Sequence, residues 1–396
     1  MNTIAIVGGG PIGLALGVGL VRKGLKVELL EKRSSISTFP KASTIHPPTL
    51  EILDEWGLFE KAKKIGRVVD RIQYWNRKTE ELIVELQLNL LRDYTKFPYR
   101  LHFDQQFLSQ IFLEALQKSP LATVKFETEV VDVHHDSHSV TLTTKETDGK
   151  ITQQSFDYLV AADGISSSVR EKLGISFTGH TNPAYHLLMG LKEYEISNRF
   201  PNLAGVAMFL DNDEWVDMIT NPDMLKVIIP ISHDRTEEIT NEFIRNKMTE
   251  IGIVKDGFDI YYKTIYKTHQ LVADRMNDGR VVLIGDAAHV NIEFGGMGMN
   301  SGIHDAYLLV DKFERIKQGG DAEQHFKQFA ERRMKINKEV VQRDTIKNTQ
   351  LIKDIDTHEK QLRQLADNEA LAKKHLLRTS MIEGFNMMFE DMNFNR

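Results

Sequence analysis

The sequence predicts an α/β fold in which a parallel sheet is joined by an inserted antiparallel sheet and by C-terminal helices. Three observations support this fold class. Apolar runs that each lead into a glycine-containing turn, as buried parallel strands do, occur at 3–7, 156–162 and 280–284. The stretches 71–88 and 177–266 alternate apolar and polar residues, which is typical of antiparallel strands. From residue 322 onward the pattern is almost wholly helical, with many charged residues.

The first thirty residues carry the most specific pattern. The strand at 3–7 runs into a turn made of Gly8, Gly9, Gly10, Pro11, Ile12 and Gly13. An apolar helix at 14–21 follows, and then a second strand that ends in Glu31. Glycines at this spacing allow a tight turn and bring the backbone and a helix N-terminus close to a pyrophosphate, while the acid can accept ribose hydroxyls. The unit predicts a Rossmann-like dinucleotide site rather than a structural turn alone.

Further elements follow from the spacing of apolar residues. Between the second strand and residue 156, this spacing predicts a helix at 49–56, a hairpin at 71–88 and a helix at 105–117. It also predicts a meander with strands at 124–126, 130–135 and 139–144. The inserted sheet is expected to contain a helix near 236–251 and strands at 187–191, 206–210, 215–219 and 225–231. A last helix begins near Ser301, before the helical C-terminal part.

Composition restricts the classes of function. The 396 residues are 41% hydrophobic and 27% charged, with a net charge of −6, which indicates a globular enzyme without a nucleic-acid or membrane footprint. There is no cysteine, so disulfides, thiolate metal sites and cysteine nucleophiles are excluded. No metal site is expected, because the histidines lack ligand spacing. The absence of a signal peptide or long apolar run predicts a cytoplasmic protein.

Two further turns follow buried strands. Asp163-Gly164 ends the strand near 156–162, and Gly285-Asp286 ends the strand at 280–284. Each aspartate taken singly could be a helix cap. Because the carboxyl ends of parallel strands converge at one sheet edge, both aspartates are expected to lie near the first glycine turn. Together with the glycine-rich stretch 295–300 before a helix, they favour FAD as the ligand.

These motifs, in this order, resemble those of the single-component (group A) FAD-dependent monooxygenases related to para-hydroxybenzoate hydroxylase. Within that family the chain most resembles phenol hydroxylases and tetracycline-inactivating monooxygenases, over about residues 1–345. The resemblance implies a GR2-type FAD-binding domain formed by 1–70, 99–176 and 268–345. It implies a β-sheet substrate domain formed by 71–98 and 177–267, followed by a helical segment, 346–396. The FAD contacts it implies are Gly8, Gly10, Pro11, Ile12, Gly13, Glu31, Lys32, Lys41, Gln105, Asp163, Arg170, Asp286, Gly296, Gly298, Met299 and Asn300.

By this resemblance, NADH or NADPH reduces FAD, and O₂ then forms a flavin C4a-hydroperoxide that hydroxylates an aromatic or polycyclic molecule. The family usually has proline where this chain has Asn291-Ile292-Glu293-Phe294. Glu293 is therefore a candidate acid or base beside the flavin, and His46 is a second catalytic candidate. The expected substrate contacts are Trp215, Met218 and Phe294.

Alternative functions remain open. One is an FAD-dependent oxidoreductase of the same fold that does not activate oxygen, and another is a flavin-binding protein that sequesters a ligand. A flavin-dependent halogenase is excluded, because the Trp-x-Trp-x-Ile-Pro signature is missing. A monomer or homodimer is expected. The apolar, Met-rich stretch 381–392 is expected to dock as a terminal helix, although it could cover the active site or contact another subunit.

Overall fold

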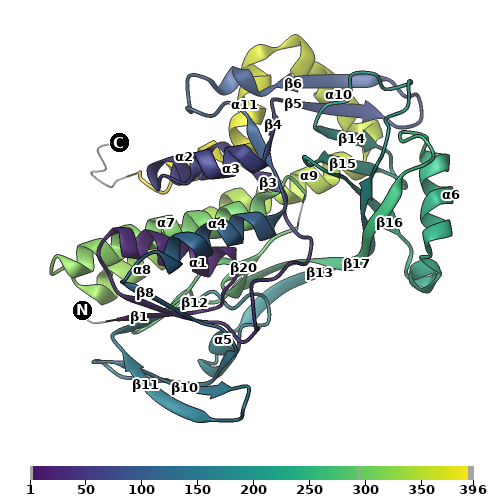
Figure 1. Cartoon of the computed structure of the whole chain (residues 1–396). Coiled ribbons are helices and arrows are strands. Elements are labelled where there is room, and N and C mark those ends of the chain that lie inside the picture. The colour runs from purple at the N-terminus through teal and green to yellow at the C-terminus, as the bar shows by residue number, and fades with distance from the viewer. Residues whose placement is uncertain (1–2, 293, 391–396) are drawn as a thin grey trace.

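A six-stranded sheet carries the predicted turns at one of its edges (Figure 1). The computed structural model describes residues 3–292 and 294–390, apart from the side chains of 234, 237, 352 and 353. Five strands are parallel, in the order β19 (Val281–Leu283), β12 (Tyr158–Ala161), β1 (Ile4–Val7), β2 (Val27–Leu30) and β8 (Ala122–Lys125). An antiparallel edge strand, β18 (Asn277–Asp278), pairs with β19.

Layers on both faces bury this sheet. On one face lie α1 (Pro11–Arg22), α4 (Gln105–Gln117) and α7 (Met297–Lys317), which pack against one another (Figure 1). On the other face lies a three-stranded meander of β9 (Thr128–His135), β10 (Val140–Glu146) and β11 (Ile151–Phe156). The strands β1, β2 and β12 are buried along their whole length, which explains their continuous apolar sequences.

The meander differs from the prediction. The strand expected at 124–126 is part of β8, which pairs in parallel with β2 in the six-stranded sheet. Helix α4 leads the chain back across the sheet, so that β8 starts at the same end as β2, and a local pattern does not reveal that partner. The third strand of the meander is β11, which was not predicted. Its residues from Thr152 to Ser155 are polar and mostly exposed. It therefore shows no alternation of apolar residues.

The inserted sheet has eight strands in the order β20–β17–β13–β16–β15–β14–β5–β6. The predicted hairpin is present as β5 (Arg71–Asn76) and β6 (Leu82–Gln87). The other strands are β13 (Phe177–Lys192), β14 (Val206–Leu210), β15 (Val216–Thr220), β16 (Leu225–Ile231), β17 (Asp259–Ala273) and β20 (His289–Val290). The two long strands β13 and β17 run back toward the six-stranded sheet (Figure 1). Strand β13 begins ten residues before the predicted 187–191, because its first part is polar and partly exposed.

Short elements connect the two large sheets. A small sheet is formed by β3 (Thr44–Ile45), β7 (Arg100–His102) and β4 (Arg67–Val69). The remaining connecting elements are α2 (Pro47–Glu55), α3 (Phe59–Ile65), η1 (Leu88–Leu91), α5 (Ser168–Lys172), η2 (His233–Glu238), α6 (Asn241–Ile251) and η3 (Gly285–Ala287). The C-terminal part contains α8 (Ala322–Ile336), the π-helical turn η4 (Asn337–Gln342), α9 (Arg343–Lys353), α10 (Ile355–Asp367), α11 (Glu369–Thr379) and α12 (Ile382–Asn386).

The eight-stranded sheet buries both of its faces. One face packs against α6, and the other packs against side chains from α10, α11 and α12. Of the Met-rich stretch, Met381, Phe385 and Met388 are buried in the core of the first sheet, as expected for a docked helix, whereas residue 392 lies outside the described residues. The C-terminal helices therefore connect the two sheets.

A buried carboxylate fastens the turn after β19 to the helices. Asp305 in α7 has no exposed surface. Its Oδ2 accepts hydrogen bonds from the Gly285 N–H at 2.9 Å and from His289 Nε2 at 2.7 Å, and its Oδ1 accepts one from Arg333 Nε. Arg333 in α8 also donates to the carbonyl and hydroxyl oxygens of Ser301. The Arg333 guanidinium and the His289 ring hold the pKa of Asp305 below its usual range, against the effect of burial.

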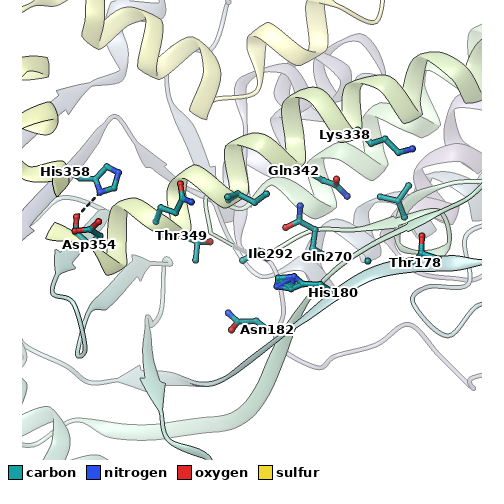
Figure 2. Close-up of a pocket in the computed structure, with 14 residues that line it drawn as sticks. Thr178, His180, Asn182, Gln270, Ile292, Lys338, Gln342, Thr349, Asp354 and His358 are labelled. Atoms are coloured by element: carbon teal, nitrogen blue, oxygen red, sulfur yellow. Dashed lines mark hydrogen bonds between the residues drawn. The ribbon is translucent and has the colours of Figure 1, made fainter. Parts of the chain in front are cut away.

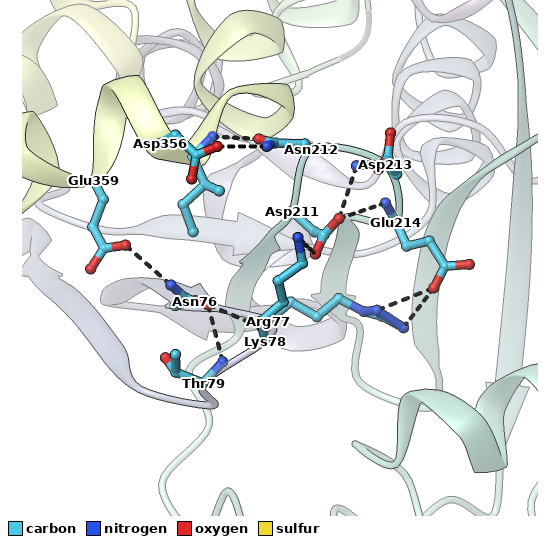
Figure 3. A network of polar contacts seen from close by, with 11 residues as sticks. Asn76, Arg77, Lys78, Thr79, Asp211, Asn212, Asp213, Glu214, Asp356 and Glu359 are labelled. Atoms are coloured by element: carbon cyan, nitrogen blue, oxygen red, sulfur yellow. Dashed lines mark hydrogen bonds and ion pairs between the residues drawn. The ribbon is translucent and has the colours of Figure 1, made fainter.

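A second network attaches α10 to the far edge of the eight-stranded sheet (Figure 3). Asn212, in the turn between β14 and β15, donates to Asp356 Oδ2 at 2.9 Å and accepts from the Ile355 N–H at 3.1 Å. Asn76, at the end of β5, donates to Glu359 Oε2 at 3.1 Å. The first turn of α10 is thus held by two loops of the sheet.

We predict that Asn212→Ala loosens α10 locally. The substitution removes two hydrogen bonds, each worth about 1 kcal/mol. Hydrogen exchange of the amides of α10 should become faster, while exchange in β13 and β16 stays unchanged. Asn198→Ala is the control, because Asn198 is exposed and no hydrogen bond of its side chain is described. Equal exchange of α10 in both variants would contradict this role for Asn212.

We predict that Asp305→Asn lowers the free energy of unfolding at pH 7 by about 3–5 kcal/mol, since it leaves the Arg333 charge buried without its counterion. The pKa of Asp305 is lower in the folded protein, so its carboxylate stabilises the fold above about pH 4 and the contribution is lost as the pH falls. The variant should therefore lose less stability between pH 5 and pH 3 than the parent protein.

Chemical denaturation across this pH range measures both effects of Asp305→Asn. Glu314→Gln is the matched control on the same helix, because Glu314 pairs with Lys23 near the surface. A partly exposed pair of this kind contributes at most about 1 kcal/mol. If the two variants behave alike, the buried network does not carry the stability assigned to it.

Candidate active site

The turn after β1 leaves an open space in front of α1. A Cβ atom on Gly8, which has φ +112°, would lie 2.3 Å from the Ala162 carbonyl oxygen, and one on Gly13 would lie 2.0 Å from the Gly8 carbonyl oxygen. These two glycines are therefore required by packing. A Cβ on Gly10 would meet no protein atom within 4 Å. Gly10 is also the N-cap of α1, which has no side-chain cap and no acidic residue in its first turn, so its N–H groups can bind an anion.

Glu31 lies directly behind this turn. It follows β2, and its side chain is almost completely buried. Oε2 accepts a hydrogen bond from the Gly9 N–H at 2.6 Å, and Oε1 accepts one from the Arg33 N–H at 3.0 Å. Each oxygen keeps a further lone pair. The carboxylate is therefore fixed beside the glycine turn and can accept hydroxyl groups, while the neighbouring Lys32 is exposed.

The turn after β12 contributes Asp163 and Arg170. Asp163 Oδ2 accepts from the Val169 N–H at 3.3 Å, and Oδ1 is buried without a hydrogen-bond partner in the described part of the chain. Arg170 donates to the Ala287 carbonyl at 3.0 Å and stacks on Phe177, with 3.9 Å between the guanidinium and the ring centre. Arg170 thus links this turn to the turn after β19, and Asp163 Oδ1 has unused hydrogen-bonding capacity.

Asp286, in the turn after β19, combines exposure with a perturbed pKa. Its side chain is exposed, yet the surrounding protein raises the pKa of its carboxyl, an effect that His289 and Lys41 partly oppose. The open space in front of Gly10, where a Cβ would meet no protein atom within 4 Å, is the recess that these turns surround. A Cβ atom on Gly285 would lie 3.1 Å from the Ile12 side chain, so this turn packs closely against the first glycine turn. All three strand ends therefore meet, as the parallel topology predicts.

The glycine turn at Gly295 and Gly296 begins α7. Gly296 has φ +66° and is the N-cap of α7, without a side-chain cap or an acidic residue in the first turn. A Cβ on Gly298 would meet no protein atom within 4 Å, and Met299 follows it in this first turn. The helix begins at Met297, four residues before the predicted start. Its free N–H groups form a second position for a negatively charged group.

Asn300 lies between the segment 44–46 and the glycine turn, and its role as a cofactor contact stays a prediction. It is fully buried. Its Oδ1 accepts from the His46 N–H at 3.0 Å, and its Nδ2 donates to the carbonyls of Thr44 at 2.9 Å and Gly296 at 2.7 Å. Asn300 therefore joins the segment 44–46 to the glycine turn at the start of α7.

His46 reinforces the same junction. Its Nε2 donates to the Gly295 carbonyl at 2.7 Å, so the second ring nitrogen, Nδ1, is an acceptor, and it is buried without a partner among the described residues. Burial, and secondarily the charge of Arg100, place the pKa of His46 well below its usual value. The ring is therefore neutral near pH 7. This geometry gives His46 a positioning contact, and its catalytic role stays a prediction.

Lys41 and Gln105 border the recess from a neighbouring segment. Lys41 is exposed, and its carbonyl accepts from Lys226 Nζ at 2.9 Å. The Gln105 N–H at the start of α4 donates to the Ala42 carbonyl at 2.9 Å. Lys226 forms a buried ion pair with Asp104, which the sequence analysis did not identify. The available signal was a lysine inside the otherwise apolar strand 225–231.

The three expected substrate contacts are not together. Trp215 and Phe294 pack edge to face with ring centres 4.9 Å apart, and each is about 1% exposed. Met218 lies on the opposite face of the eight-stranded sheet, in the core beside α6. Successive side chains of β15 alternate between the faces, so Trp215 and Met218 point in opposite directions. Glu293 lies outside the described residues.

The described part of the chain contains neither a membrane-spanning helix nor a cluster of metal ligands. Across residues 3–292 and 294–390, no helix is long and apolar enough to span a membrane. Within those ranges, no group of three or more histidine or acidic side chains is arranged to hold a metal ion.

Comparisons with characterised proteins agree with this geometry. The 6-hydroxy-3-succinoylpyridine 3-monooxygenase of Pseudomonas putida is 32% identical over 343 residues, which cover 84% of each chain. A para-nitrophenol 4-monooxygenase of a Pseudomonas species is 26% identical over 343 residues, which cover 85% of this chain and 83% of the relative.

Solved structures share the fold. The p-nitrophenol 4-monooxygenase of Pseudomonas putida superposes with a TM-score of 0.87 at 24% identity, over 98% of this chain and 99% of that one. The anhydrotetracycline hydroxylase of Streptomyces rimosus superposes with a TM-score of 0.78 at 23% identity, over 96% and 76% of the two chains. The model of the FAD binding domain family matches residues 1–344. The chain therefore belongs to the FAD binding domain family.

Proposed function

We propose that this protein is an FAD-dependent monooxygenase that uses NADH or NADPH and O₂ to hydroxylate an aromatic or polycyclic small molecule. The observation that carries the proposal is the recess where three strand ends meet, with an open Gly10, an uncapped α1 and the accessible Asp286. The relatives named above are monooxygenases, which favours oxygen activation over an oxidoreductase that does not activate oxygen.

In this proposal the residues around the first turn hold the AMP half of FAD. The α1 N-terminus faces the diphosphate across Gly10, Pro11 and Ile12, and Glu31 accepts the ribose hydroxyls, with Lys32 beside it. The free oxygen of Asp163 and the carboxylate of Asp286 accept hydroxyl groups of the ribityl chain and its surroundings. Arg170 keeps their two turns together.

The flavin ring is placed at the α7 N-terminus, next to Gly298 and Met299. Lys41 and Gln105 border it from the other side, and Asn300 and His46 hold the glycine turn in shape. When bound, FAD supplies hydride acceptance and oxygen activation, and the protein supplies orientation and exclusion of water. Glu293 remains the candidate proton donor or acceptor on the loop that precedes the turn.

The proposed domain organisation places the six-stranded sheet in one domain and most of the eight-stranded sheet in the other. Residues 1–70, 99–176 and 268–345 form the FAD-binding domain, residues 71–98 and 177–267 form the substrate domain, and 346–396 form the helical C-terminal segment. In this arrangement the partners are a small aromatic substrate and O₂, with no nucleic acid or membrane. The protein acts as a monomer or homodimer in the cytoplasm.

We predict that Gly10→Val abolishes FAD binding while the protein still folds. The backbone of Gly10 is extended and a side chain there meets no protein atom, so it would occupy space needed by the diphosphate. FAD affinity, measured by fluorescence quenching of titrated FAD, should fall at least about 100-fold, which corresponds to about 2.7 kcal/mol. The melting temperature of the apoprotein should change little.

Gly13→Ala is the contrasting variant, because its Cβ would collide with the Gly8 carbonyl. It should lower the melting temperature of the apoprotein. Unchanged FAD affinity in Gly10→Val would place the cofactor elsewhere and overturn the proposal.

We predict that Asp286→Ala weakens FAD binding about 10- to 100-fold. It removes a charged hydrogen-bond acceptor worth about 1.5–3 kcal/mol. The same fluorescence titration measures the change. The control is Asp367→Ala, an exposed aspartate at the end of α10 for which no side-chain contact is described. Equal affinity of the two variants would leave Asp286 with only a structural role.

A further inference from the structure

A large groove lies beside the candidate active site (Figure 2). Its volume is about 950 Å³, and it runs between the paired strands β13 and β17 and the continuous helix formed by η4 and α9. None of its lining residues belongs to the turns after β1, β12 or β19. The groove is therefore separate from the residues proposed to hold FAD.

Regular elements form both walls of the groove. The helical wall presents Lys338, Gln342 and Ile346 at intervals of four residues, followed by Thr349 and Gln350, so these side chains form one stripe about 18 Å long. The opposite wall is one face of the strand pair, because Thr178 lies opposite Val272 and His180 lies opposite Gln270. This shape fits an elongated molecule.

The groove reaches the active site at Ile292. Ile292 lines the groove and precedes the glycine turn at Gly295 by three residues. Phe294, two residues farther along the chain, packs against Trp215, and each of these two side chains is about 1% exposed. A ligand that approaches the glycine turn therefore finds space on the side of Ile292 and not between the two aromatic rings.

Apolar and polar side chains both line the groove. Val272 and Ile292 are apolar and nearly buried. The helical wall carries amide and hydroxyl groups, the apolar Ile346 and the cation Lys338, for which no ion pair is described among residues 3–292 and 294–390. The carboxylate of Asp354 is already engaged as the N-cap of α10, where it accepts from the Thr357 N–H at 3.1 Å. Lys338 and Asp354 lie at opposite ends of the helical wall, so the charge near Lys338 is positive (Figure 2).

We propose that this groove binds the tail of the substrate: an aromatic ring carrying a flexible polar chain that ends in a carboxylate. The ring passes Ile292 toward the glycine turn, and the chain lies along Gln342 with its carboxylate near Lys338. A one-ring phenol would fill only a small part of about 950 Å³, whereas binding cavities normally enclose most of their ligand. This assignment rests on the proposed function, because it places the reacting ring at the FAD site.

The test compares three probes on the FAD-loaded protein: phenol, para-hydroxyphenylbutanoate and the uncharged amide of that acid. Isothermal titration gives the Kd of each probe, and the flavin content is measured on the same samples. The acid should bind at least about tenfold more tightly than phenol, and more tightly than the amide, since it fills the groove and meets Lys338.

Three variants separate the contributions. Lys338→Met should make the acid and the amide bind equally, and Gln342→Leu should weaken both tailed probes by about fivefold, while phenol is unaffected in either variant. Lys335→Met is the matched control, because Lys335 is an exposed lysine of α8 that does not line the groove. It should leave all three Kd values unchanged.

The outcomes are distinguishable. If the three probes have equal Kd values, the groove does not bind the substrate's tail. The same conclusion follows if Lys338→Met and Lys335→Met change the Kd values equally. If the protein retains no FAD, the proposed function is wrong. The role of the groove is then judged separately, by whether the tailed probes have lower Kd values than phenol. A preference for the amide over the acid would overturn the assignment of a carboxylate.

Discussion

The buried carboxylate of Asp305 is the interaction on which the arrangement of the site depends. It holds the backbone N–H of Gly285, the ring of His289 and the guanidinium of Arg333 around one point. These groups come from the turn after β19, from β20 and from α8. A charge in the interior is tolerated only when it is paired and hydrogen-bonded, and this one is satisfied from three directions. The turn that carries Asp286 is consequently fixed relative to α7.

A second set of contacts fixes the opposite wall of the recess. Asn300 and His46 tie the segment 44–46 to the glycine turn, and Lys226 ties the neighbouring Lys41 carbonyl to the eight-stranded sheet. The turns on two sides of the recess are therefore held in place by buried polar side chains. Such support keeps accessible groups such as Asp286 in place without covering them.

The C-terminal helices connect the two sheets and also complete the groove. The loops of the eight-stranded sheet hold the first turn of α10, and α9 leads from there to η4 (Figure 3). The π-helical turn η4 carries Lys338 and Gln342, which face the groove. Departures from α-helical geometry of this kind are frequent at functional sites. The same helices that stabilise the fold therefore define the space proposed for the substrate's tail.

The sequence by itself determined the parallel strands, the glycine turn at Gly8–Gly13 and the convergence of Asp163 and Asp286. These features could be predicted because they depend on local patterns and on one topological rule, that parallel strands end at the same edge. The hairpin, the helix at 105–117 and most strands of the second sheet were predictable for the same reason. Their apolar periods are encoded in consecutive residues.

Only the tertiary structure decided which side chains share a site. The partner of β8 depends on where α4 returns the chain, and the separation of Met218 from Trp215 depends on which way β15 faces. The buried partners Asp305 and Arg333 are 28 residues apart, and no local pattern relates them. The groove could not be inferred from the sequence either, because its walls come from strands and helices that are distant in the chain and meet only in the folded protein.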